Sequence, residues 1–203
     1  SAQVTRVRLQ ALSISGLSSE RPPSFETVVE ATSDGRFVAE VFPGRYAVAV
    51  LPPSSGGRAL AVQELIVPAD APDVTEFSVT LQARPEFQTR FEAPAGESMQ
   101  GLPVTLTPEP VAADADPLAV QTYARQRSMT ADENGLVAVT SDQGNFRLLA
   151  QPPTASNFPW VLYQALAVGE FKTVLPAQTI PYPTVLSGVV SATDGALVGN
   201  AEV

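Results

Sequence analysis

One phrase of this sequence occurs twice, 100 residues apart. The first copy, SDGRFVAEVFPGRYAVAVLPP, covers residues 33–53, and the second, ENGLVAVTSDQGNFRLLAQPP, covers residues 133–153. Gly35 of the first copy corresponds to Gly135 of the second, and both copies end in two prolines. A period of this length is that of a small domain and not of a solenoid repeat. The chain is therefore expected to contain one small domain in more than one copy.

Apolar residues alternate with polar ones in short runs, which is the period of a β-strand and not of a helix. The runs are VTRVRLQAL (4–12), RFVAEV (36–41), RYAVAVL (45–51), FSVTL (77–81) and FQTRF (87–91). Strands of this kind place one face on a core and the other in water, as in antiparallel sheets. The pairs Asp34-Gly35 and Asn134-Gly135 accept the positive φ of tight hairpin turns. The sequence thus predicts an all-β fold.

The start of the repeating unit occurs as SAQV (1–4), GLPV (101–104) and NAEV (200–203). The expected domains are a first sandwich without its opening strand at 1–84, a complete second sandwich at 85–183, and the opening strands of a third at 184–203. The short link Arg84-Pro85, which the proline stiffens, indicates a restricted angle between the sandwiches.

The unequal ends of the chain allow three interpretations. We expect the chain to be a piece of a longer array. The first alternative is that residues 184–203 pack as a stub on the second sandwich. The second is that they add a strand to the first sandwich of a neighbouring molecule, which would join copies head to tail.

Parts of the unit resemble the carboxypeptidase regulatory-like family, whose pattern runs V-x-G-x-V, a D-G turn, G-x-A-x-V, D-x-x-G-x-F and P-G-x-Y-x-V. The matching residues are Leu186, Gly188, Val190, Asp194, Gly195, Ala201 and Val203 for the first half, and Thr32, Asp34, Gly35, Phe37, Pro43, Gly44, Tyr46 and Val48 for the second. The middle copy departs from the pattern at Arg90 and Gln143. The resemblance implies tandem small antiparallel β-sandwiches with transthyretin-like or immunoglobulin-like Greek-key topology. Stalk modules of pilins and adhesins share this sandwich, but a shared fold transfers little chemistry.

The composition excludes several classes of function. With a net charge of −9, the chain lacks the basic face that nucleic acid requires. It contains neither cysteine nor histidine, which excludes disulfides, zinc clusters, thiolate nucleophiles and histidine bases. No apolar run is long enough for a membrane-spanning segment. Because the residues offer no catalytic set, we expect a protein that is not an enzyme and has no cofactor.

Two acidic turns have the oxygen ligands that a calcium ion prefers. They are residues 132–134 (DEN) and the pair Asp114 and Asp116. Solvated hairpin tips explain both turns more simply, so no metal site is expected. Lys172 is the only lysine, and the isopeptide cross-link that the stalk-module resemblance implies would have to use it. We favour a surface lysine.

Four aromatic residues are candidates for carbohydrate binding, which uses exposed rings. They are Phe158, Trp160, Tyr163 and Tyr182. Residues 160–163 are apolar on both faces of the expected strand, so we favour a core or an inter-domain contact over a sugar site. The acidic segment 108–121 is expected to be an exposed loop or, alternatively, a surface on which a partner docks.

These observations favour a non-enzymatic tandem β-sandwich module that serves as a structural spacer, a stalk or a protein-interaction platform. Its expected location is the bacterial cell envelope or the extracellular space, and its expected partners are another protein or neighbouring copies of the same domain. The alternatives are a carbohydrate-binding module and accessory domains of a larger secreted enzyme.

Overall fold

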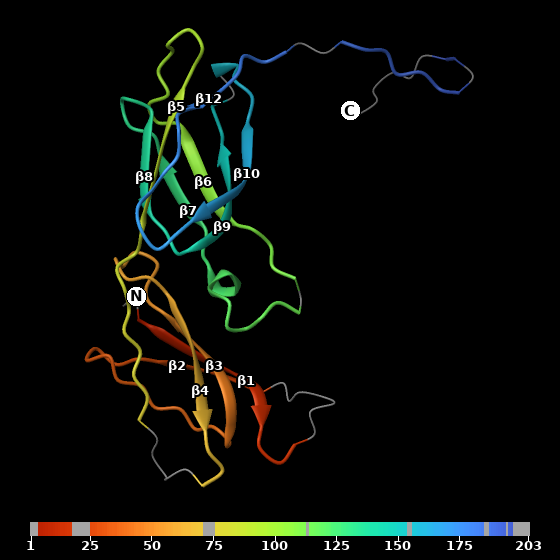
Figure 1. Ribbon diagram of the computed structural model, residues 1–203. Helices are drawn as coiled ribbons and strands as arrows, with labels where there is room; N and C mark the ends of the chain where they lie inside the picture. Colours follow the sequence, from red (N-terminus) through yellow and green to blue (C-terminus); the bar gives the residue numbers. More distant parts are fainter. Residues whose placement is uncertain are drawn as a thin grey trace.

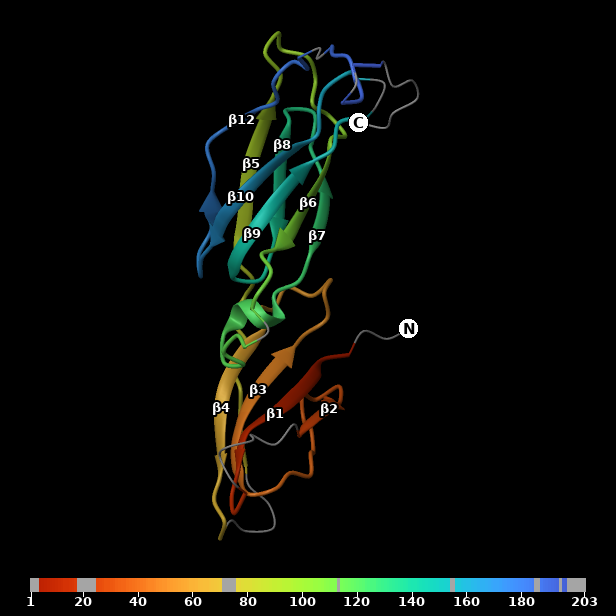
Figure 2. The ribbon, with the colours of Figure 1, turned by 90° about the vertical axis from the view of Figure 1, so that its right-hand side faces the viewer.

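The computed structural model describes residues 4–17, 25–70, 76–112, 114–153, 156–184, 187–193 and 195–196. Two β-sandwiches lie end to end along the long axis of the molecule (Figures 1 and 2). The N-terminal sandwich contains β1–β4, and the C-terminal sandwich contains β5–β12. The only helical element in the described part is the short 3₁₀ helix η1 (Val120–Tyr123). No helix among these residues is long and apolar enough to cross a lipid bilayer. The predicted all-β fold of antiparallel β-sandwiches is therefore confirmed.

The N-terminal sandwich is built on one antiparallel sheet with the strand order β2-β1-β3-β4. Its strands are β1 (Arg6–Ile14), β2 (Glu26–Glu30), β3 (Gly44–Leu51) and β4 (Ala61–Val67). The period-two alternation places the apolar side chains of β1 and β3 on one face, where they form a buried core. The buried residues are Val7, Leu9, Ala11, Tyr46, Val48 and Val50. Burying each large side chain of this kind contributes about 1.5–3 kcal/mol.

The C-terminal sandwich has two sheets. The first has the order β10-β9-β6-β7, and in the second β5 pairs with β8 on one side and with β11 and β12 on the other. The strands are β5 (Glu86–Glu92), β6 (Pro103–Pro108), β7 (Arg127–Thr130), β8 (Leu136–Thr140), β9 (Gly144–Ala150), β10 (Val161–Val168), β11 (Thr173–Val174) and β12 (Gln178–Thr179). Phe87, Phe91 and Phe146 are fully buried between the sheets.

The four-stranded sheets of the two sandwiches share one topology, because β2-β1-β3-β4 corresponds to β7-β6-β9-β10. Val7 lies opposite Val29, and Val104 lies opposite Met129. Val7 therefore corresponds to Val104 at a spacing of 97, so the expected alignment of SAQV with GLPV is wrong by three residues. The difference lies between the paired residues, because Val104 and Met129 are 25 positions apart whereas Val7 and Val29 are 22 positions apart. The NAEV copy lies outside the described residues.

Turns are present at the predicted glycines, but they are not the predicted hairpins, because β7 and β8 belong to different sheets and residues 36–41 form no strand. Gly35 has φ +83° and Gly135 has φ +71°. The N–H of Gly35 donates to the carbonyl oxygen of Thr32 at 2.9 Å, and that of Gly135 donates to Asp132 at 3.0 Å. A Cβ atom at Gly135 would also lie 2.2 Å from the carbonyl oxygen of Phe91, so this position needs glycine for space as well as for conformation.

Two of the predicted strands are not strands in the structure. Residues 36–41 and 77–81 show the expected alternation of half-buried and exposed side chains, and their apolar residues pack on the N-terminal core. Within the described residues, however, no backbone hydrogen bond joins these two segments to each other. In the C-terminal sandwich, β5 lies between the corresponding segments and pairs with both. No described residue takes this central position in the N-terminal sandwich, so the two segments lack a partner.

Candidate functional site

The joint between the sandwiches contains a buried arginine. Arg84 precedes Pro85, and the side chain of Arg84 is 0% exposed. Its guanidinium group donates hydrogen bonds to three main-chain carbonyl oxygens of the loop that follows β3. The acceptors are Ser54, Gly56 at 2.6 Å and Pro53 at 3.1 Å. The Arg84 Nε atom lies 3.3 Å from Oδ1 of Asp142, which belongs to the C-terminal sandwich. One side chain thus contacts both sandwiches.

Asp142 is the acidic centre of the joint, and its side chain is also 0% exposed. Arg125 binds it with two hydrogen bonds, from Nε to Oδ2 at 2.9 Å and from a terminal nitrogen to Oδ1 at 3.1 Å. The same guanidinium donates to the carbonyl oxygen of Pro52, and that of Arg127 donates to Ser54. Arg84 and Arg125 therefore bind the Asp142 carboxylate directly, and these two arginines together with Arg127 bind main-chain oxygens of residues 52–54 and 56.

Burial and charge oppose each other at this cluster. Burial by itself would raise the pKa of Asp142, but the hydrogen bonds and charge of Arg125, together with Arg84 and Arg127, outweigh it and place the pKa below its ordinary value. Burial lowers the pKa of Arg84, and the two neighbouring arginines lower it further, while Asp142 opposes both effects. The carboxylate is therefore required to keep three closely spaced cations together.

An apolar contact lies beside the charged cluster. Tyr123 of η1 is buried against Ala49 and Leu60 of the N-terminal sandwich. The guanidinium carbon of Arg8 lies 5.6 Å from the centre of the tyrosine ring, which is within the range of a cation–π contact. Figures 1 and 2 show η1 between the two sandwiches. The tyrosine therefore packs on an apolar surface at the outer face of the N-terminal sheet. This surface is formed by Ala49, Leu60 and Val62.

The loop that carries Tyr123 is held by polar contacts within the C-terminal sandwich. The Gln121 side-chain amide donates to the carbonyl oxygens of Glu109 at 3.1 Å and Asn145 at 3.0 Å, and its oxygen accepts the N–H of Asn145 at 2.6 Å. The N–H of Leu118 donates to Asp116 Oδ1 at 2.9 Å, which forms a local turn. The expectation of an exposed loop over 108–121 is therefore wrong for its second half, which leads into the joint.

The four aromatic candidates do not form one site. Phe158 and Tyr182 stack on each other, with ring centres 5.8 Å apart and planes 14° apart. Tyr163 faces the core, where its ring lies 6.2 Å from that of Phe91. Trp160 is 63% exposed and Leu162 is 49% exposed. Within the described structure these two side chains lie neither in a core nor in the contact between the two sandwiches, which Tyr123 makes, while Val161 and Tyr163 pack on the core as expected. An inter-domain contact of Trp160 elsewhere stays a prediction.

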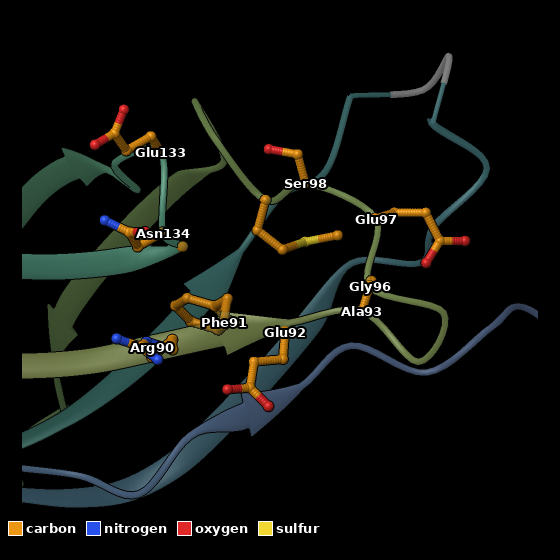
Figure 3. Close-up of a pocket in the computed structure, with 11 residues that line it drawn as sticks. Arg90, Phe91, Glu92, Ala93, Gly96, Glu97, Ser98, Glu133 and Asn134 are labelled. Atoms are coloured by element: carbon orange, nitrogen blue, oxygen red, sulfur yellow. The ribbon is translucent and has the colours of Figure 1, made fainter.

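A shallow pocket of about 370 Å³ lies at the far end of the C-terminal sandwich (Figure 3). It opens between the segment that follows β5 and the turn around Asn134, and carboxylates of Glu92, Glu97 and Glu133 line it. The pKa of Glu97 is lowered, first by the hydrogen bond from its own backbone N–H and next by the one that Tyr182 donates at 2.8 Å. The described residues contain no group of three side chains placed to hold a metal ion.

The acidic turns considered for calcium use their carboxylates internally. Asp132 Oδ1 accepts the backbone N–H groups of Asn134 and Leu136, at 2.8 and 2.9 Å. Lys172 lies at the surface, with Nζ 3.4 Å from a carboxylate oxygen of Glu86. These contacts are those of solvated turns and of a surface ion pair.

The residues of the joint were not among the sequence-predicted candidates. Arg84 and Asp142 are 58 positions apart, so no local pattern connects them. The one available signal was at Asp142, because the corresponding residue of the first phrase is the apolar Phe42. A charged residue that replaces an apolar one at an equivalent position indicates a different environment.

These features define an all-β chain of two successive sandwiches that are joined by a buried charged cluster and an apolar contact. No family model and no curated protein matches the sequence. Solved structures that resemble it include the Streptococcal ancillary pilin, at 16% identity and a TM-score of 0.41 over 90% of this chain and 58% of that chain. The C-terminal fragment of pilus adhesin SpaC from Lactobacillus rhamnosus GG has 12% identity and a TM-score of 0.27, with 91% of each chain covered.

The Bacillus anthracis TIE protein has 9% identity and a TM-score of 0.31, over 86% of this chain and 30% of that chain. The chain thus spans 30% of the length of the TIE protein and 58% of that of the ancillary pilin. At these identities the likeness concerns the fold alone.

Proposed function

We propose that this chain is a non-enzymatic spacer or stalk module, with a surface for protein interaction, in a bacterial cell-envelope or secreted protein. The joint is the observation that supports this function. A spacer must keep its two ends at a fixed separation and angle, and in a two-domain chain this depends on what joins the domains.

Domains joined by a linker and a small polar contact move relative to each other by default. Here the linking residue Arg84 is itself buried, and it contacts main-chain oxygens of one sandwich and a carboxylate of the other. Moving the sandwiches apart would expose Tyr123 and break the hydrogen bonds that Arg84, Arg125 and Arg127 donate to the main chain of residues 52–54 and 56. The two sandwiches are therefore held in one arrangement.

The proposal also accounts for the chemistry of the chain. A spacer needs a rigid core and a soluble surface, and the net charge of −9 provides the second. Without cysteine and histidine the chain has no thiolate nucleophile and no histidine base. We expect no turnover when the purified chain is assayed on a broad panel of hydrolase substrates, and robust turnover would contradict the non-enzymatic function.

The lack of cysteine makes the rigidity directly measurable. Two spin labels attached at Gln63→Cys on β4 and Ala138→Cys on β8 would be exposed and would lie in different sandwiches. Pulsed electron resonance should give one narrow distance distribution. A broad or multimodal distribution in the otherwise unchanged chain would contradict the spacer function. Two labels within one sandwich, at Gln63→Cys and Arg45→Cys, provide the matched control for label motion.

Carbohydrate binding remains a second candidate because of one observation, the exposure of the Trp160 ring. An exposed indole is a common stacking surface for sugars. This function predicts a glycan-array signal that Trp160→Ala abolishes and that Phe171→Ala, at another exposed ring, leaves unchanged. No signal from the unchanged chain would reject it.

A further inference from the structure

The first strand and the last segment of the C-terminal sandwich are direct neighbours in one sheet. The chain enters this sandwich at β5 and leaves it through residues 173–180, which contain β11 and β12. Both of these short strands pair with β5 in parallel, between Phe87 and Glu92. We call residues 173–180 the exit segment.

The direction of these strands decides how a pull on the chain acts on them. β5 runs along the long axis of the molecule, from the joint to the far end of the C-terminal sandwich (Figures 1 and 2). Because the exit segment is parallel to β5, it also begins near the joint and ends at the far end. The chain before β5 therefore pulls toward the joint, and the chain after the exit segment pulls away from it. Tension along the long axis slides the two past each other in opposite directions.

Hydrogen bonds join β5 and the exit segment near both ends. Besides the pairing of β11 and β12, the N–H of Leu175 donates to the carbonyl oxygen of Gln88 and that of Ile180 donates to Glu92, both at 2.9 Å. These bonds lie across the direction of the pull, so sliding distorts all of them together. A hydrogen bond weakens steeply once its geometry is distorted. Sliding must therefore break the bonds as a group, whereas peeling from one end would break them one at a time.

A buried threonine bridges the interruption between β11 and β12. Pro176 lies in this interruption, and a proline has no N–H to donate to a ladder. The hydroxyl of Thr89, a residue that is 1% exposed, donates to the carbonyl oxygen of Pro176 at 3.2 Å. Thr89 lies on the buried face of β5, where it alternates with Phe87 and Phe91. It thus connects the two segments at the point where the ladder is broken.

The exit segment is also anchored at its far end. Ile180 is fully buried, and beyond it the ring of Tyr182 stacks on that of Phe158, with ring centres 5.8 Å apart. The Tyr182 hydroxyl donates to Oε1 of Glu97 at 2.8 Å. On its other side β5 pairs with β8. Both partners of the contact are therefore held by the rest of the sandwich and cannot separate freely.

We propose that β5 and the exit segment form a tension clamp, which keeps the C-terminal sandwich folded when the chain is pulled along its long axis. The inference rests on the proposed spacer or stalk function and adds that the spacer bears load. Force that enters at Glu86 crosses the clamp and leaves at Pro183, so residues 93–172 lie outside its path. The sandwich keeps its length under tension until the clamp breaks as a unit.

The test is single-molecule force spectroscopy on the whole chain, which has no cysteine of its own to compete for the handles. Handles at Glu86→Cys and Pro183→Cys load the clamp in shear. Handles at Glu86→Cys and Glu170→Cys hold the joint-side ends of the same two segments, so they peel the clamp open from one end. Pro183 and Glu170 are both exposed. At the same loading rate, the unfolding force should be about twofold or more higher in shear than in peeling.

The two pairs of handles are matched, and the released length identifies the event. Both pairs share the first handle, so the ion pair between Glu86 and Lys172 is absent from both. Breaking the clamp in shear should release the chain of about 97 residues between the handles, which is about 320–350 Å when extended. Peeling should release a chain of about 84 residues, or about 280–300 Å.

Thr89→Val tests the bridge within the clamp, because it removes the hydroxyl and keeps the shape of the side chain. It should lower the force in shear more than the force in peeling, since only shear loads the bridge together with its neighbours. Thr130→Val is the control, at an exposed position of β7 in the other sheet, and it should leave both forces unchanged.

Equal unfolding forces for the two pairs of handles would overturn the proposal. If Thr89→Val lowers neither force, or both by the same fraction, the role of Thr89 in the clamp is wrong. The spin-label measurement keeps the proposed function separate: a narrow distance distribution with equal forces would support the spacer and reject the clamp. A broad distribution with a higher force in shear would reject the fixed spacer and support the clamp.

Discussion

Replacing Asp142 with alanine removes the only carboxylate that the described structure places among Arg84, Arg125 and Arg127. The two hydrogen bonds from Arg125 and the contact with Arg84 are lost together. Arg84 keeps its carbonyl acceptors but remains buried as a cation, next to two others. We expect the joint to loosen, because the three cations then repel each other without a counter-charge, while the core of each sandwich stays folded.

The magnitude follows from the burial of both partners. Breaking a buried ion pair by removing one partner costs about 3–5 kcal/mol, because the other charge stays desolvated. A domain of this size has a total free energy of unfolding of about 5–15 kcal/mol. The loss is therefore a large share of the stability, and at this chain length it corresponds to a fall in melting temperature of about 6–20 °C. Asp142→Asn keeps the shape of the side chain and one hydrogen-bond acceptor, so the loss of free energy of unfolding should be smaller than for Asp142→Ala.

The assay is urea unfolding followed by circular dichroism, together with the spin-label distance across the joint. Asp142→Ala should lower the free energy of unfolding and broaden the distance distribution. Glu30→Gln is the control, because the Arg6–Glu30 pair is exposed and 3.9 Å apart, and such pairs contribute little. If Asp142→Ala changes stability no more than Glu30→Gln and the distribution stays narrow, the joint does not hold the sandwiches together.

Three further predictions concern single residues. The folded-state pKa of Asp142 is lowered, so its contribution to the free energy of unfolding is complete above the unfolded value of about 3.9 and is lost as the pH falls through the lower folded value. In urea titrations, the difference in stability between the unchanged chain and Asp142→Ala should therefore shrink between neutral pH and pH 3. A constant difference would contradict this prediction. Tyr123→Ala should lower the free energy of unfolding by about 3 kcal/mol and broaden the spin-label distance distribution, since the contact with Ala49 and Leu60 is lost. An unchanged distribution would show that the charged cluster alone fixes the angle between the sandwiches. Gly35→Ala should lower the free energy of unfolding by about 1–2 kcal/mol from backbone strain alone. Gly135→Ala should lower it more in the same assay, because the added Cβ also meets the carbonyl oxygen of Phe91. Equal losses would refute the close approach of the Phe91 carbonyl oxygen to residue 135.

The alternation of apolar and polar residues predicted strands correctly where a neighbouring strand is present to pair with them. Alternation located β1, β3 and β5 because each of them has a buried face and a neighbour to bond with. The same alternation at residues 36–41 and 77–81 predicted strands that the structure lacks. A strand is completed by hydrogen bonds to another segment, and a local pattern contains no information on whether that segment is there.

The joint could not be predicted, for a different reason. Arginine and aspartate are mostly exposed in proteins, so sequence reasoning assigns them to the surface unless a partner is known. Arg84 meets Asp142 only because two separately folding sheets bring the ends of their strands together. Aromatic residues such as Trp160 are selected as candidates because exposure of a large ring is unusual, whereas exposure of arginine or aspartate is ordinary.

The guanidinium groups of Arg84, Arg125 and Arg127 contact the loop at residues 52–56 through its main-chain oxygens. Every amino acid supplies the same oxygen atom, so what these arginines recognise is the path of the chain and not its side chains. A substitution at the exposed Ser54 can therefore keep these contacts, provided that the prolines and glycines that shape the loop remain. An insertion would change the path of the main chain, and a change at the arginine side would remove the donors.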